Sequence, residues 1–140
     1  MLQQIKISSE KPPQWILDAV KKQFDVNWED NVIFTYGDLI TSSRGEMRED
    51  LMAHEPYHTQ QQSKFGGKDK WWKEYLKNPE FRYKQELEAY RKQYKWTQKN
   101  VRDRNESFQY LMHYARSLAG PMYGNISDVN QALKEIKQCN

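Results

Sequence analysis

The sequence predicts an α+β fold, a single mostly helical domain over residues 1–140 with a small N-terminal sheet packed on a pair of helices. Apolar and polar residues alternate in parts of the first 41 residues, and from about residue 45 the apolar residues recur every three or four positions. The chain has 140 residues, near the commonest size of one domain. Its aromatic share of 14% supplies large areas for burial. These three observations favour one compact fold dominated by helices.

The first 41 residues are expected to form short strands and one helix. Isoleucines that alternate with polar neighbours predict a strand over Gln3–Ser8. The prolines of Lys11-Pro12-Pro13 signal a helix start, and apolar residues at helical spacing extend this helix to about Asp25. The segment Asn31–Thr41 is β-rich and has a bend at Gly37-Asp38. The sheet is therefore expected to have at least two short strands.

The rest of the chain is expected to be helical. A helix from about Gly45 ends at Gly66-Gly67, and a short helix over Lys68–Lys77 follows. Asn78-Pro79 is a typical start for a long helix that continues to about Lys99. Two further helices are expected at about Glu106–Leu118 and from Ser127 onward. The apolar stripe of the helix expected from Gly45 comprises Met47, Leu51, His54, His58, Gln61 and Phe65.

Cysteine content and hydropathy exclude several classes of protein. The only cysteine is Cys139, which excludes an internal disulfide and a cysteine zinc site and favours a reducing compartment. No apolar run approaches the roughly 18 residues of a membrane span, and Met1–Gln14 is too polar for a secretory signal. We therefore expect a cytoplasmic protein without a membrane partner.

Five consecutive residues, His54-Glu55-Pro56-Tyr57-His58, form the pattern H-E-x-x-H. Two histidines four positions apart on a helix project from one side, so both imidazoles can bind one zinc ion at about 2.0–2.1 Å. Glu55 can then take a proton from a zinc-activated water and pass it to a leaving amine. The pattern predicts a zinc site with Glu55 as general base. The alternative, that both histidines are core residues satisfied by hydrogen bonds, stays open.

A third zinc ligand is required, and no further histidine lies close by in the sequence. Glu86 and Glu88 on the following long helix are the candidates. Glu86 borders the expected buried stripe of Tyr83 and Tyr90, whereas Glu88 shares its face with charged and polar residues. Glu86 is therefore the predicted ligand, and Glu88 is expected to be a solvated surface residue.

These features resemble a known family. A strand before an H-E-x-x-H helix, followed by a helix with Glu86-Leu87-Glu88-Ala89 as E-x-x-A, is similar to the gluzincin metallopeptidases in their minimal form. The segment from Tyr36-Gly37-Asp38 to His58-Thr59-Gln60-Gln61 also resembles small metallopeptidase-like proteins found in phage genomes. A phage-encoded protein would act in the host cytoplasm.

The resemblance implies a minimal zincin-like fold and a zinc-dependent hydrolase that cleaves a peptide or amide bond in a peptide or protein substrate. Its metal ligands would be His54, His58 and Glu86, and its base would be Glu55. An edge strand near Ile33–Tyr36 would bind an extended substrate backbone.

Two positions depart from the family pattern. Pro56 lies inside the motif and is harmless only if the first turn of the helix begins near Ala53. Tyr90 stands where gluzincins often carry an aspartate that supports a motif histidine. Asp38, Asp50 or the Tyr90 hydroxyl is expected to take that orienting role.

A tetrahedral intermediate also needs a hydrogen-bond donor beside the metal. Tyr123, in a turn rich in glycine and proline, and His113, on the fourth helix, are the candidates. Packing roles for both side chains remain the alternative.

Two other classes of function stay open. One is a catalytically inactive, zinc-stabilised interaction protein. The other is a basic and aromatic module that binds nucleic acid. The segment from Lys64 to Arg104 contains 13 Lys and Arg but only 6 Asp and Glu. The aromatic residues interleaved with these charges are Trp71, Trp72, Tyr75, Phe81, Tyr83 and Trp96.

Overall fold

The computed structural model describes residues 3–138, so the prediction that rests on Cys139 lies outside the described residues. The fold is α+β and mostly helical, as the sequence predicts. The chain divides into two compact units, unit 1 (Met1–Lys77) and unit 2 (Asn78–Asn140). The single domain over residues 1–140 stays a prediction.

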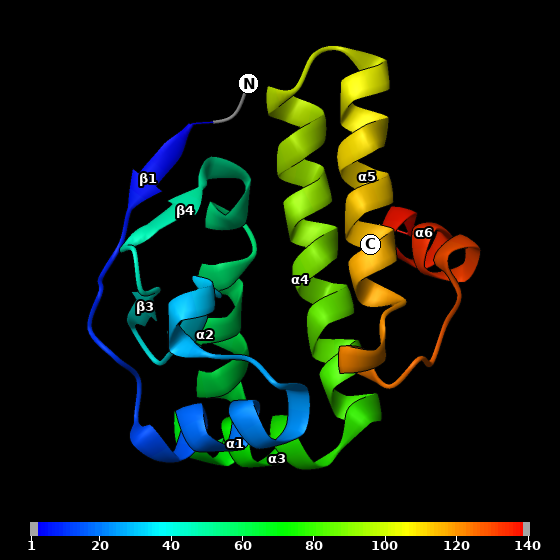
Figure 1. The fold of residues 1–140 in the computed structure, drawn as a ribbon. Helices are drawn as coiled ribbons and strands as arrows, with labels where there is room; N and C mark the ends of the chain where they lie inside the picture. The colour runs from blue at the N-terminus through cyan, green and yellow to red at the C-terminus, as the bar shows by residue number, and fades with distance from the viewer. Residues whose placement is uncertain (1–2, 139–140) are drawn as a thin grey trace. The chain divides into compact units, whose positions relative to one another are not determined.

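The strands of unit 1 form two antiparallel pairs. β1 (Gln4–Lys6) pairs with β4 (Glu46–Arg48), as Figure 1 shows, and β2 (Phe34–Tyr36) forms a hairpin with β3 (Leu39–Thr41). Gly37 begins the hairpin turn at φ +61°, a conformation that glycine adopts without strain. The expected strands are therefore present, but they form two sheets of two strands each rather than one small sheet.

The segment that follows Gly45 corrects the prediction of one helix from Gly45 to Gly66-Gly67. Its first residues belong to β4, and the next form the 3-10 helix η2 (Glu49–Met52). The α-helix α2 (Glu55–Lys64) begins only inside the H-E-x-x-H motif.

The reason for this difference lies in Met47, which fits a helical stripe and a strand equally well. Met47 lies opposite Ile5 in the β1–β4 pair and is almost completely buried there. A few residues do not distinguish a period of 3.6 from a period of two, so the partner strand decides.

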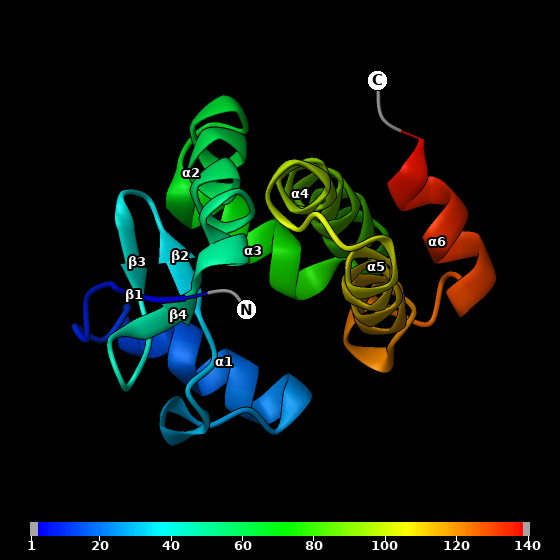
Figure 2. The same cartoon turned by 90° about the horizontal axis from the view of Figure 1, so that it is seen from above.

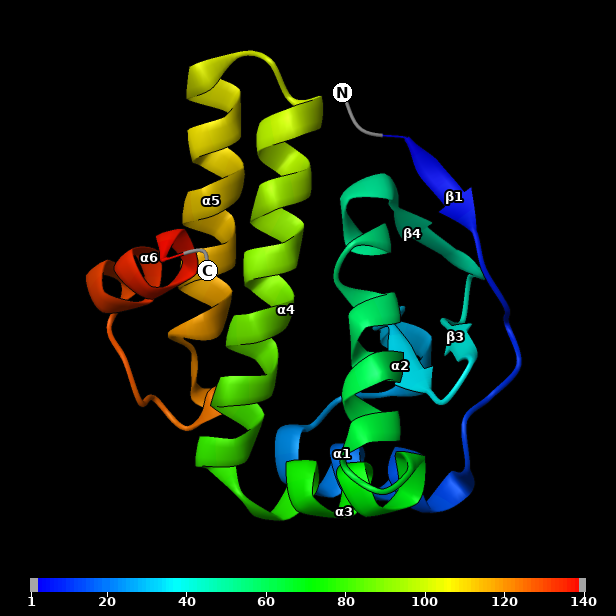
Figure 3. The ribbon, with the colours of Figure 1, turned by 180° about the vertical axis from the view of Figure 1, so that it is seen from behind.

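Two other helices of unit 1 agree with the predicted ranges. α1 (Gln14–Phe24) begins directly after the proline pair, and the 3-10 helix η1 (Trp28–Asp30) follows it. α3 (Lys68–Lys77) follows Gly66 and Gly67, whose positive φ angles of 102° and 115° end α2. Figure 3 shows α3 continuing the chain from α2. The buried residues of α3 are Trp71, Trp72, Tyr75 and Leu76.

Unit 2 consists of helices. α4 (Pro79–Asn100) and α5 (Arg104–Leu118) run side by side, as Figure 2 shows. α6 (Val129–Lys137) packs against both. The 3-10 helix η3 (Pro121–Tyr123) connects α5 to α6. The predicted helices are confirmed, with boundaries shifted by about two residues. The side chains that cap them with hydrogen bonds are Asn78, Asp103 and Asp128.

The core of unit 2 combines apolar packing with a few buried polar contacts. Its cluster of buried residues comprises Tyr83, Leu87, Leu111, Tyr114, Ala115, Leu118, Ala132 and Ile136. Arg82, which is also buried, donates from Nε to the carbonyl oxygen of Met122 at 2.9 Å and so fixes η3 to α4. In the described part of the chain, no helix has the length and apolar character that crossing a membrane requires.

Tyr83 links α4 to α6, because its hydroxyl donates to the Glu135 carboxylate and also lies 2.9 Å from Ser127 Oγ. Desolvation and the bond to Glu135 raise the pKa of Tyr83 to about 12. The neutral hydroxyl is therefore the form that stabilises the folded state.

We predict that Tyr83→Phe lowers the free energy of unfolding by roughly 1 kcal/mol at pH 8, because Glu135 loses a part-buried hydrogen bond. Since the pKa is raised, this contribution is fully present below about pH 10 and is lost as the pH rises through about 12. Urea unfolding of both proteins at several pH values measures it. A difference that does not shrink between pH 10 and pH 12 would contradict the assignment.

Candidate metal centre

The two motif histidines and Glu55 lie at the start of α2 and point into the protein. His54 is the residue before the helix, Glu55 is its first residue, and His58 follows one turn later. Only 4% of the surface of each histidine and 8% of that of Glu55 is exposed. The backbone of His54 is already in the helical region, with φ −90° and ψ −57°, so the four-residue spacing keeps both rings on one side.

Pro56 does not disturb this arrangement. It occupies the first turn of α2, where a backbone N–H has no partner within the helix and the fixed φ of proline suits the start of a helix. The late start of α2 thus makes the proline compatible with the motif. The rings of His54 and His58 lie 4.9 Å apart between centroids, at an angle of 79°.

His58 is oriented by a residue of its own helix. Its Nδ1 lies 2.7 Å from Oε1 of Gln61, and an amide oxygen only accepts hydrogen bonds. The proton of the neutral ring is therefore on Nδ1, which leaves the Nε2 lone pair for a metal ion. The spacing of three residues on a helix could have indicated this partner from the sequence.

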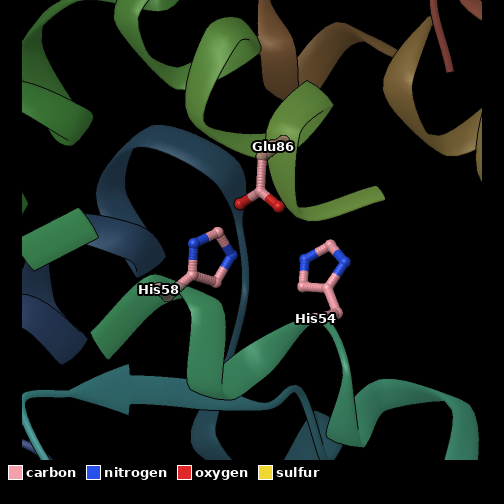
Figure 4. Close-up of side chains that lie close together, drawn as sticks. All are labelled: His54, His58 and Glu86. Carbon is pink, nitrogen blue, oxygen red and sulfur yellow. The ribbon is translucent and has the colours of Figure 1, made fainter. Parts of the chain in front are cut away.

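Glu86 is the third member of the group. His54, His58 and Glu86 each offer one ligand atom, and these atoms all lie within 4.8 Å of one another. Figure 4 shows the Glu86 carboxylate turned toward both imidazole rings. Glu86 is buried on α4, whereas Glu88 is exposed, as the stripe analysis predicts. A buried group of His54, His58 and Glu86 can therefore hold a metal ion.

The size of the group suits a small divalent ion. Ligand atoms bound tetrahedrally at about 2.0–2.1 Å lie about 3.4 Å from one another. The separations of 4.8 Å or less in the group exceed this value by at most about 1.4 Å. Two imidazoles and one carboxylate are a set that zinc accepts, with a fourth position left for water or substrate.

The two carboxylate oxygens of Glu55 have different surroundings. Thr35 Oγ1 donates to Glu55 Oε1 at 2.9 Å, while Oε2 lies 3.9 Å from Nε2 of His54. One oxygen is thus held by a hydroxyl from β2 and the other faces the histidine. Thr35 lies 20 residues before Glu55, and no local pattern in the sequence indicates the contact.

The outer edge of β2 is already bonded to helices of unit 1. The carbonyl oxygen of Thr35 accepts from Gln62 Nε2 at 2.7 Å and from Trp72 Nε1 at 2.9 Å, and Gln62 Oε1 accepts from the Gly37 N–H at 2.6 Å. Both lone pairs of the Thr35 carbonyl are therefore used. The Thr35 carbonyl is therefore not available to a substrate, and substrate binding along Ile33–Tyr36 stays a prediction.

An aromatic wall lies beside His58. The ring of Trp71 is 5.4 Å from the His58 ring and stacks on Tyr75 at 4.7 Å. All buried side-chain nitrogen and oxygen atoms of the described residues have a hydrogen-bond partner. The histidines are therefore compatible with a hydrogen-bonded cluster as well as with a metal site, and only metal binding distinguishes the two.

The structure places the two candidate oxyanion donors in unit 2. Tyr123 is part of η3 and packs against the hydrophobic cluster of that unit. His113 is exposed on α5, with its ring 6.3 Å from that of Tyr114. Neither belongs to the ligand group, and their catalytic roles stay predictions.

The three candidates for orienting a histidine lie in different settings. Asp50 is buried and accepts two hydrogen bonds from Arg48, at 3.0 and 3.1 Å. Asp38 is exposed in the hairpin turn, and the ring of Tyr90 stacks on Tyr114. The residue that bonds to His58 is Gln61, which sequence reasoning placed only on the helical stripe.

Comparisons with known proteins do not identify a family. A scan against protein-family models, a search of curated proteins and a search of solved structures each found no match. The resemblance to gluzincins therefore rests on the sequence motif and stays a prediction.

We predict that the protein, purified without added metal, contains about one zinc ion per chain. His54→Ala, His58→Ala and Glu86→Gln should each reduce zinc affinity by more than the about 10–100-fold that loss of an outer partner costs. Elemental analysis and titration against a chelator measure this. His113→Ala, at an exposed histidine, is the matched control and should bind zinc normally. A wild-type protein that takes up no zinc would instead support the hydrogen-bonded cluster.

A second prediction concerns Gln61. Gln61→Ala should lower zinc affinity about 10–100-fold, because His58 loses the acceptor that fixes its tautomer. Gln61→Glu should keep most of the affinity, since a carboxylate accepts the same proton. Gln60→Ala, at the exposed neighbouring position, is the control. Equal zinc affinity of Gln61→Ala and the wild type would show that Gln61 does not orient His58.

Proposed function

We propose that this chain is a zinc-dependent metallopeptidase of the gluzincin type. The observation that carries the proposal is the buried group of His54, His58 and Glu86, with Glu55 adjoining it on the same helix as His58. Two imidazoles and two carboxyl groups rarely share a buried region without a cation or a catalytic task, because removing them from water is costly. The family resemblance of the motif supports the same function.

In this proposal the side chains of the chain have separate tasks. His54, His58 and Glu86 hold zinc, which supplies Lewis-acid polarisation of a carbonyl and activation of water. Glu55 accepts a proton from the attacking water and passes it to the leaving amine. The hydroxyl of Thr35, bonded to Oε1, fixes the Glu55 carboxyl so that Oε2 faces the metal group.

One observation favours a second candidate, a zinc-stabilised protein without catalysis. The Thr35 carbonyl at the edge of β2 already accepts two side-chain hydrogen bonds, so it cannot bind a substrate in extended conformation. A peptidase of this kind would bind its substrate with other backbone groups. The two candidates share the metal site and differ only in the use of Glu55.

The nucleic-acid hypothesis for the region between Lys64 and Arg104 loses most of its support. Stacking on bases requires exposed rings, and four of the six interleaved aromatic residues are buried. These four are Trp71, Trp72, Tyr75 and Tyr83.

We predict that Glu55→Gln reduces hydrolysis of an unstructured protein, such as fluorescently labelled casein, by about 10²–10⁴-fold. Zinc content should stay at the wild-type level, because Glu55 is not a metal ligand in the proposal. The measurement combines initial rates with elemental analysis of the same samples.

Glu88→Gln is the matched control, since Glu88 is an exposed glutamate that neighbours the ligand Glu86 on α4. It should hydrolyse casein at the wild-type rate. Substantial activity in Glu55→Gln would refute the assignment of the base. A zinc-loaded wild type that cleaves no protein substrate would favour the non-catalytic candidate.

A further inference from the structure

Unit 2 contains a cavity that the metal centre does not use. Its volume is about 340 Å³, and it lies where the end of α4, the start of α5 and the end of α6 come together. Small-molecule sites have volumes of about 300–1,000 Å³, so the cavity is large enough for a small ligand. All residues that line it belong to unit 2.

The lining of the cavity is positively charged. Arg102, Arg104 and Lys137 line it, all three are exposed, and none of the lining residues is acidic. Within residues 3–138, none of the three cations forms an ion pair. Asp103 lies between the two arginines in the sequence, but its carboxylate accepts from the Glu106 N–H at 3.0 Å and caps α5.

The lining of the cavity also contains apolar and aromatic side chains. Val101 and Leu111 are buried residues that form part of its lining, and Tyr94 and Phe108 add two rings. Phe108 is 49% exposed, so a ligand can reach it. The site thus combines an aromatic wall with a cluster of positive charges.

We propose that this cavity binds a nucleoside phosphate with more than one negative charge. Guanidinium groups bind phosphate oxygens through paired hydrogen bonds, and aromatic rings stack on the flat face of a base. The same chemistry is offered by a free nucleoside diphosphate and by the phosphorylated 5′ end of a single strand. This proposal does not rest on the proposed peptidase activity.

Titration of the ¹⁵N-labelled full-length protein with ADP, in low salt and without added divalent metal, tests the proposal. ADP should shift the amide signals of residues 101–111. It should bind at least about tenfold more tightly than adenosine, which lacks phosphate groups, and than inorganic phosphate, which lacks a base. Equal binding of ADP and inorganic phosphate, or no binding of ADP at millimolar concentration, would overturn it.

Variants separate the site from general electrostatic attraction. The pair Arg102→Glu and Arg104→Glu should weaken ADP binding at least about tenfold. The matched control carries the same charge change at exposed lysines of α4 outside the cavity, Lys84→Glu with Lys95→Glu, and should retain most of the affinity. An equal loss in both pairs would overturn the proposal.

Phe108→Ala tests the aromatic half of the site. It should remove most of the preference for ADP over inorganic pyrophosphate while pyrophosphate binding persists; an unchanged preference would count against stacking.

A 5′-phosphorylated oligonucleotide of eight thymidines identifies the source of the ligand. At least about tenfold tighter binding than ADP, through the same arginines, assigns a strand end, and weaker binding assigns a free nucleotide.

Discussion

The candidate site depends on one constraint, that ionisable groups removed from water need partners. His54, Glu55, His58 and Glu86 are each less than one tenth exposed, and a charge buried without compensation is strongly destabilising. Gln61 accepts from His58 and Thr35 donates to Glu55, and both are neutral groups that add no charge of their own. A divalent cation would balance the Glu86 carboxylate and use the lone pairs of both imidazoles.

The start of α2 determines how this constraint is met. Because the chain leaves η2 at Met52 and enters α2 at Glu55, the motif occupies the first turns of the helix, where proline is tolerated. The hairpin of β2 and β3 then lies against α2, with Thr35 bonded to Glu55 and Gln62. The hydroxyl of Thr35 holds the base, while its carbonyl accepts from Gln62 and Trp72 and is therefore not available to a substrate.

The basic residues in the second half of the chain are interleaved in the sequence with aromatic residues, but most of these aromatic residues are not available to a ligand. The aromatic residues interleaved with lysines mostly form cores, among them Trp71 and Trp72 in unit 1 and Tyr83 in unit 2. The cations around the cavity of unit 2 come instead from a loop and from two helices, and they combine with rings that the sequence pattern did not single out. A local excess of charge therefore locates a region, while burial decides which side chains in it are available to a ligand.

The sequence by itself determined the helices with strong end signals and the candidate ligands. Pro12-Pro13, Gly66-Gly67 and Asn78-Pro79 fix helix boundaries through backbone effects that act locally, and the spacing of His54 and His58 fixes their common side in the same way. The stripe on α4 likewise separated Glu86 from Glu88. Only the tertiary structure decided that Met47 pairs with β1 instead of extending a helix, and that Thr35 holds Glu55. Both depend on partners 20 or more residues away, and no periodic pattern within one segment records which distant segment it will meet.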